Sequence, residues 1–315
     1  MPLPLAENPV SSESSARLWP PIVRFISLER RLGQRAVAAG PVAAALYEFL
    51  RFGAKQAWAC LFGGAMVALL VASHLFYPPH AILARYDLLV IAAVMIQIFM
   101  LATRLETFEE AKVILLFHLV GTCMELFKTA TGSWIYPEPS LIRLGGVPLF
   151  TGFMYGAVGS YIARSWRLFD FRFSGHPPLW TLSILSVAIY ANFFADHFGI
   201  DLRYFILAGT AILFARTRIF FKVWRVYRSM PMLVGFLLVA LFIWFAENAG
   251  TAARAWIYPS QIQHWSSVPI SKLGSWLLLM IISYVMVAWI NRPQEMTAED
   301  AALAKAQPSP EAQEI

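Results

Sequence analysis

The chain has 315 residues, of which 58% are hydrophobic and only 14% are charged, and its mean hydropathy is +0.59. One soluble core cannot bury so much apolar side chain, so the composition excludes an ordinary soluble domain and indicates a polytopic membrane protein. The net charge of +6 suits contact with anionic lipid and gives no reason to expect nucleic acid as a partner.

Residues 1–56 are predicted to be a cytoplasmic segment. The first part, to about residue 35, is polar and proline-rich and shows no cleavable signal. Residues 36–55 can form an interfacial helix with apolar side chains toward lipid. Those side chains are Leu46, Phe49, Leu50 and Phe52.

Eight apolar windows follow, with lengths that suit helices crossing a bilayer core of ~30 Å. They cover residues 57–76, 88–103, 113–131, 146–163, 179–197, 203–217, 231–250 and 268–291. Lysine and arginine gather in alternate loops, and such residues remain on the cytoplasmic side, so both termini are predicted to be cytoplasmic. The basic run from Arg216 to Arg228 is expected to be a solvated loop on that inner face, in preference to a specific lipid-headgroup site.

The tetrapeptide Trp-Ile-Tyr-Pro occurs twice, at 134–137 and 256–259, each time nine residues after a glutamate. These glutamates, Glu125 and Glu247, are 122 positions apart, as are the two tetrapeptides. Other residues recur in the same order along the chain, and a shared order over this length indicates an internal duplication. An even number of spans then predicts two repeats of the same orientation, in contrast to inverted repeats.

The predicted fold is therefore all-α, a membrane bundle of eight transmembrane helices in two parallel four-helix repeats. The predicted parts after the N-terminal segment are a first repeat (57–163), a cytoplasmic linker (164–178), a second repeat (179–291) and a flexible cytoplasmic tail (292–315).

Both glutamates are predicted to lie in the outer third of the membrane and to face the bundle interior. Glu125 is 13 residues beyond Lys112, which corresponds to ~20 Å along a helix from the inner edge. Each belongs to a polar stripe at helical spacing, and a carboxylate facing lipid would cost about 2.5–3.5 kcal/mol. Lys128 and Arg254 are available as their partners.

Glu125 and Glu247 are the candidate catalytic residues, as acid or base. The candidate substrate-binding residues are the repeated polar and aromatic side chains near the same boundary. They are His74, Arg85, Lys128, Trp134, Tyr136, His197, Arg203, Asn248, Trp256 and Tyr258.

Plainer structural roles stand beside these functional ones. The glutamates can simply lock the two halves together, and the repeated aromatic side chains can form an interfacial belt. The two arginines can cap the outer boundary or hold a phosphate or carboxylate group. The histidines lack the spacing of a metal-binding helix motif, so no metal site is predicted, and the sequence leaves any cofactor unknown.

A family resemblance comes from the stretch that begins Glu-Leu-Phe-Lys-Thr at 125–129, continues as Gly-Ser-Trp-Ile-Tyr-Pro-Glu at 132–138, and ends at 145–155 with Gly-Gly-Val-Pro-Leu-Phe-Thr-Gly-Phe-Met-Tyr. This stretch resembles the YoaT-like bacterial integral-membrane proteins, a family of unknown function. The resemblance covers most of residues 40–292, implies a multi-pass bacterial membrane protein and supplies no activity. The expected location is the bacterial inner membrane. A looser similarity links the intramembrane acid and aromatic turn to membrane carotenoid hydratases and cyclases.

Two hypotheses of function follow, and a purely structural or assembly role is a third. The first is a membrane enzyme acting on an outer-leaflet lipid or isoprenoid, in which one buried carboxyl group supplies a proton and the other stabilises positive charge. The second is a transporter or permease whose parallel repeats rock around the paired glutamates.

Overall fold

The computed structural model of the chain describes residues 20–78, 80–298 and 300. The chain divides into two compact units, residues 1–54 and 55–315. The first nineteen residues of the predicted N-terminal segment, and the predicted tail from residue 301 on, lie outside the described residues.

The first unit is built on two helices, α2 (Pro20–Ala38) and α3 (Pro41–Ala59), of which α3 runs on into the second unit. Gly40 separates them with a φ of 109°, a conformation that favours glycine. Apolar side chains expected to face lipid lie on α3, where Leu46 and Phe49 are 58% and 69% exposed. The helix expected over 36–55 is thus divided: residues 36–38 end α2, and α3 begins at Pro41 and runs to Ala59.

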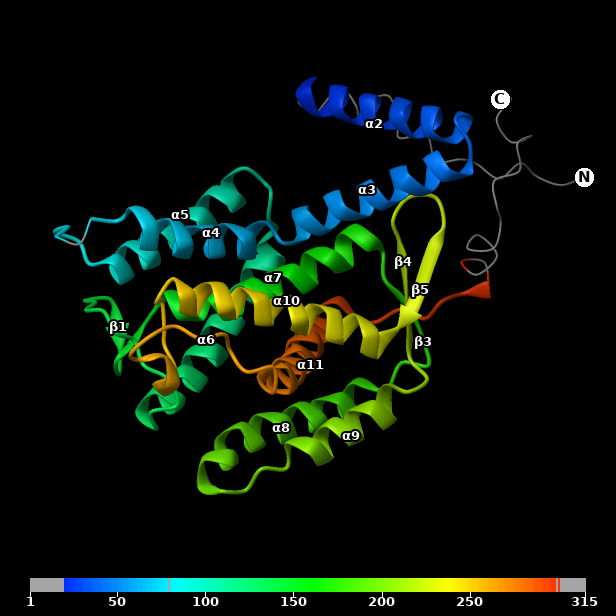
Figure 1. Ribbon diagram of the computed structural model, residues 1–315. Coiled ribbons are helices and arrows are strands. Elements are labelled where there is room, and N and C mark those ends of the chain that lie inside the picture. Colours follow the sequence, from blue (N-terminus) through cyan, green and yellow to red (C-terminus); the bar gives the residue numbers. More distant parts are fainter. Residues whose placement is uncertain (1–19, 79, 299, 301–315) are drawn as a thin grey trace, which may run out of the picture. The chain divides into compact units, whose positions relative to one another are not determined.

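The second unit contains one helix in each of the eight apolar windows (Figure 1). These are α4 (Leu61–Phe76), α5 (Arg85–Ala102), α6 (Phe108–Ala130), α7 (Phe150–Phe169), α8 (Leu179–Ala195), α9 (Arg203–Phe214), α10 (Met232–Ala252) and α11 (Lys272–Asn291). Two short 3-10 helices, η1 (Asp196–Phe198) and η2 (Pro259–Gln261), follow α8 and the second Trp-Ile-Tyr segment.

Five of these helices are long and apolar enough to cross a membrane, counting only the described residues: α5, α6, α8 extended by η1, α10 and α11. The count rises to six if α3 and α4, which are bent at their junction, form one span. The helix α9 is apolar but short. The protein is thus a predominantly helical, multi-pass membrane protein.

The start of α6 is fixed by a capping box. The Thr107 hydroxyl accepts a hydrogen bond from the Glu110 N–H at 3.2 Å, and the Glu110 carboxylate accepts one from the Thr107 N–H at 2.8 Å. This reciprocal pair satisfies two backbone donors that a helix start otherwise leaves unpaired.

Glycines let α6 and α7 approach closely. A Cβ atom at Gly156 would lie 2.9 Å from the Ile114 side chain, and one at Gly159 would lie 2.7 Å from Phe117. In a membrane, where lipid tails are as apolar as the helices, such close packing is a main source of helix association. The glycines of α7 therefore fix the face of α6 that carries Glu125.

Two small sheets join the helices. A two-stranded hairpin of β1 (Arg143–Leu144) and β2 (Val147–Pro148) precedes α7, and β3 (Arg172–Ser174), β4 (Arg218–Lys222) and β5 (Tyr227–Pro231) form an antiparallel sheet in the order β3-β4-β5.

The basic run expected to be a loop is thus mostly the β4–β5 hairpin. Its Ile219 side chain is buried, so an apolar side chain within the charged run is anchored by packing. The described part of the C-terminal tail also pairs with this sheet. Phe173 donates to the Gln294 carbonyl at 2.9 Å and accepts from the Met296 N–H at 2.8 Å.

Candidate functional site

Glu125 lies on α6, is 5% exposed, and accepts three hydrogen bonds from neutral side chains. Trp134 donates its indole N–H to Oε2 at 2.7 Å, and the Tyr136 hydroxyl donates to the same oxygen. Tyr155, on α7, donates to Oε1 at 2.8 Å. Both carboxylate oxygens of Glu125 are therefore engaged.

Glu247 lies on α10, is 3% exposed, and has a matching environment. Its Oε1 accepts from the Tyr258 hydroxyl, and its Oε2 accepts from the indole N–H of Trp276 on α11. Each glutamate thus binds the tyrosine of its own Trp-Ile-Tyr segment and an aromatic side chain from the next long helix.

The two Trp-Ile-Tyr segments contact each other directly. Ile135 and Ile257 form an antiparallel bridge in which each N–H donates to the other's carbonyl at 3.0 Å. Beside the bridge, the rings of Trp134 and Tyr258 meet edge to face with centroids 6.3 Å apart. The two glutamate environments therefore meet at this bridge and ring contact.

Tyr155 and Trp276 were not among the predicted site residues, although the sequence holds a signal for them. Each lies eight residues after the valine of a repeated Val-Pro pair, at Val147 and Val268. The signal is weak because the two aromatic residues differ in type. Both are hydrogen-bond donors, which is the property that their shared position requires.

Glycines make room for two of the site's aromatic rings. A Cβ atom at Gly121 would lie 2.5 Å from Cγ of Tyr155, so only glycine lets that ring reach Glu125. In the second half, a Cβ atom at Gly250 would lie 2.3 Å from the Trp256 ring. Trp256 packs over α10 there, and it differs from Trp134 in making no hydrogen bond to its glutamate among the described contacts.

Neither cation expected to pair with the glutamates forms an ion pair with them among the described residues. Lys128 forms an ion pair with Asp196 at 2.6 Å. Arg254 has an exposed side chain, and its carbonyl accepts a hydrogen bond from Arg85 at 3.1 Å. The acids are instead held by hydroxyl and indole donors, which leaves them without a salt bridge among the described residues.

Arg85 joins the two halves. Its side chain is 7% exposed. Its guanidinium forms an ion pair with Glu138 at 2.6 Å and donates to the carbonyls of Ala253 at 3.0 Å and Arg254 at 3.1 Å. Because those carbonyls lie just past the end of α10, the cation also complements that helix terminus. The Arg85 guanidinium is therefore occupied by protein groups, and one of them is the Glu138 carboxylate.

The remaining predicted binding residues surround the site more loosely. Asn248 accepts a hydrogen bond from the Val268 N–H at 2.9 Å and so ties α10 to the start of the α11 segment. Arg203 lies 3.6 Å from both Asp196 and Asp201. His74 and His197 are exposed, and no group of three His, Cys, Asp or Glu residues in the described part of the chain could hold a metal ion.

A buried ion pair joins α7 to the residues that precede α6. Arg164 and Glu106 both have fully buried side chains and are 3.1 Å apart. Ser160 donates to Glu106 at 2.9 Å, and Arg164 donates to the Trp58 carbonyl at 3.2 Å. The predicted cytoplasmic linker begins at Arg164, whereas this residue lies inside α7 and its side chain is fully buried.

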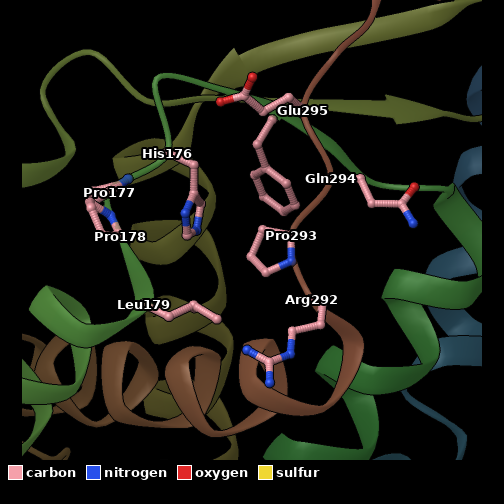
Figure 2. A pocket seen from close by; sticks show the side chains of 9 residues that line it. His176, Pro177, Pro178, Leu179, Arg292, Pro293, Gln294 and Glu295 are labelled. Carbon is pink, nitrogen blue, oxygen red and sulfur yellow. The ribbon is translucent and has the colours of Figure 1, made fainter.

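A small hollow of about 220 Å³ lies beside β3, away from both glutamates. Figure 2 shows His176 on one side of it and Arg292 and Pro293 on the other. The His176 ring nitrogen Nε2 lies 2.7 Å from the Tyr284 hydroxyl, and burial lowers the pKa of the His176 imidazole. No residue predicted for the functional site lines this hollow.

Comparison with known proteins gives two matches. A family model described as "Protein of unknown function (DUF817)" matches residues 48–284. The chain is also similar to a Bacillus subtilis (strain 168) protein named "Uncharacterized protein YoaT", with 40% identity over 259 residues that cover 82% of this chain and 97% of the relative. No solved structure matches.

Proposed function

The chain belongs to the DUF817 family of bacterial membrane proteins of unknown function, and we propose that it is an enzyme that performs acid–base chemistry on a lipid or isoprenoid in the outer leaflet. Glu125 and Glu247 are the proposed catalytic residues. The proposal includes eight spans in two parallel repeats, with both termini cytoplasmic and the chain in the inner membrane.

The repeat proposal is supported by the way in which equivalent groups meet. Ile135 pairs with Ile257, its own counterpart 122 positions on. In each half a tyrosine from the tetrapeptide and a donor from the next long helix bind the glutamate. These relations are expected if two copies of one four-helix unit are related by a twofold axis along the membrane normal.

The observation that carries the catalytic proposal is the pairing of one tryptophan and at least one tyrosine with each buried carboxyl group. An indole N–H can only donate, so the oxygen facing it must accept. A tyrosine hydroxyl can donate or accept, so the oxygen facing only a tyrosine can carry a proton. In Glu125 that oxygen is Oε1, which faces Tyr155, and in Glu247 it is Oε1, which faces Tyr258.

This arrangement suits proton transfer to an apolar substrate. One protonated glutamate gives its proton to an alkene carbon or to a leaving oxygen and becomes a carboxylate, while the other carboxylate stabilises the positive charge that develops. The adjacent tyrosines keep either protonation state hydrogen-bonded.

The test is lipid and pigment analysis of a deletion strain carrying the wild-type gene, Glu125→Gln or Glu247→Gln. The wild-type gene is expected to restore a lipid or pigment species lost in the deletion strain, whereas both variants leave its precursor accumulated. An unchanged set of species in the deletion strain would exclude the enzyme proposal.

A permease is the second candidate, because polar groups continue inward along α6. The Thr122 hydroxyl and the Nδ1 atom of His118 are buried without a hydrogen-bond partner, and such atoms usually bind ordered water. Cysteine labelling at Thr122 distinguishes the two candidates. A permease requires that residue 122 becomes accessible from each side in turn, whereas the enzyme proposal requires access from the outer side alone.

A further inference from the structure

We infer that Lys272 binds the anionic head, a phosphate or carboxylate group, of a ligand whose tail lies beside Glu247. This inference rests on the proposed function and adds the substrate class: an amphiphile with an acidic head and an apolar chain.

The ring of Tyr258 lies between Lys272 and Glu247 and contacts both side chains. Lys272 is the first residue of α11, it is half-buried, and its Nζ atom lies 4.9 Å from the centre of the Tyr258 ring. The hydroxyl of that same tyrosine donates to Glu247. An anion on the ammonium group would therefore hold the first carbons of its tail close to the carboxyl group.

The Lys272 ammonium group has no ion-pair partner within 4.0 Å among the residues that the structure describes. The nearby acid, Asp196, already pairs with Lys128 at 2.6 Å and lies 3.6 Å from Arg203. An ammonium group beside buried aromatic surface is stabilised when it gains a charged hydrogen-bond acceptor. Lys272 is thus the cation of this group that is left to bind a ligand.

The charges around Lys272 are of both signs. Lys272 shares this place with two other cations, Lys128 and Arg203, and with the carboxylates of Glu247 and Asp196. Arg203 also lies 3.6 Å from Asp201, so Lys272 is the one of these three cations with no acid within 4.0 Å among the described residues, and its ammonium group can take an anion.

The first half has no lysine at the equivalent position, so the two glutamates differ in their access to a cation. The position equivalent to Lys272, counted from the repeated Val-Pro pair, is Thr151. Its side chain is 3% exposed and donates to the Pro148 carbonyl at 2.9 Å. An acidic ligand head is therefore expected on the side of Glu247. Glu125 lies on the other side of the two paired Trp-Ile-Tyr segments.

The test uses the purified full chain in phosphatidylcholine nanodiscs and measures the thermal unfolding midpoint. Dioleoyl phosphatidic acid is the probe, dioleoylglycerol has the same tails without the phosphate, and inorganic phosphate has no tails. Phosphatidic acid is expected to raise the midpoint of the wild type, and dioleoylglycerol is not. If inorganic phosphate acts equally well, the site takes a free anion and the assignment of an amphiphile is overturned. If only phosphatidic acid acts, it takes a lipid head.

The variants assign the effect to one lysine. Lys272→Met and Lys272→Gln are expected to need at least tenfold more phosphatidic acid for the same shift, whereas Lys272→Arg retains the response. Lys112→Met is the matched control, since the Lys112 side chain is 68% exposed and lies near the N-terminus of α6, on a different helix from Lys272. An unchanged response in folded Lys272→Met or Lys272→Gln would overturn the inference.

Glu247→Gln separates this inference from the proposed function. It keeps the lysine and should bind the probe as the wild type does, even though it is expected to be inactive in the lipid analysis. Loss of binding in this variant, with Lys272→Met unaffected, would contradict the assignment to Lys272.

Discussion

Tyr155 on α7 donates its hydroxyl hydrogen bond to Glu125 on α6 at 2.8 Å, and so joins the third and fourth long helices of the first half at a buried carboxyl group. The same contact recurs in the second half, where Trp276 takes the place of the tyrosine. The position of each acid is therefore set by side chains from two elements, and substitutions can separate its structural and chemical roles.

Glu125→Gln is expected to preserve the fold, whereas Glu125→Ala is not. A glutamine carbonyl oxygen can still accept from Trp134 and Tyr136, and its amide can donate to Tyr155, whose hydroxyl can accept. Alanine leaves these buried donors unpaired, at about 1–3 kcal/mol for each. Thermal unfolding in detergent measures the difference, and equal losses in both variants would contradict the hydrogen-bond arrangement.

Gly121→Ala is expected to displace Tyr155 and destabilise the protein by about 1–3 kcal/mol, because the new methyl group overlaps the tyrosine ring. Gly64→Ala is the matched control. Gly64 is also in a helix, but a Cβ atom there meets nothing within 4 Å, so the higher helix propensity of alanine should add up to about 1 kcal/mol. Equal midpoints for the two variants would refute the close contact.

Arg85→Met is expected to lower the free energy of unfolding by about 2–3 kcal/mol, because it removes charged hydrogen bonds to Glu138 and to two carbonyls past α10. Arg85→Lys cannot reproduce the fork and should recover only part of the loss. Lys112→Met, which breaks an exposed ion pair with Glu109, should cost at most about 1 kcal/mol. Chemical denaturation of the three variants provides the measurement.

Arg164→Met alone is expected to cost about 3–5 kcal/mol, because it leaves the buried Glu106 carboxylate without its cation. Adding Glu106→Gln removes that unpaired charge. The double variant should therefore be more stable than Arg164→Met, and a double-mutant cycle measures the coupling between the two side chains. Additive effects would mean that the two groups do not interact.

His176, which lines the hollow beside β3, is expected to make the stability of the protein depend on pH. Because burial lowers the pKa of His176, the unfolded chain takes up this proton more readily than the folded chain does. The contribution to stability is complete above the ordinary histidine pKa of about 6.5 and is lost as the pH falls below it. His176→Gln should thus show a smaller drop in unfolding midpoint from about pH 7.5 to about pH 5.5 than the wild type, measured in the same buffers. Exposed His264 is the control position.

The positions of the helices were largely predictable, since apolar length and composition alone locate all eight windows. The β4–β5 hairpin was not predictable in this way. A run with many basic residues reads as a solvated loop, whereas the packing that buries Ile219 depends on residues far away in the chain.

The candidate site was predictable in part. The repeated spacing located Glu125, Glu247 and the tetrapeptide aromatics, which the structure brings together in each half. Sequence distance along a helix suggested Lys128 as the partner of Glu125, but its side chain points to Asp196 on another element. Contacts between helices, such as those of Tyr155 and Trp276, need the tertiary arrangement, which spacing within one segment does not give.

The bridge between Ile135 and Ile257 is self-complementary, because the two backbones offer the same donor and the same acceptor to each other. Neither partner needs a feature that the other lacks, which is the condition that an isologous contact in a symmetric dimer also meets. Since the bridge uses main-chain atoms, the identities of its side chains are left unconstrained by it. The bridge can thus persist while the side chains of Trp134 and Trp256, next to it in each segment, make different contacts.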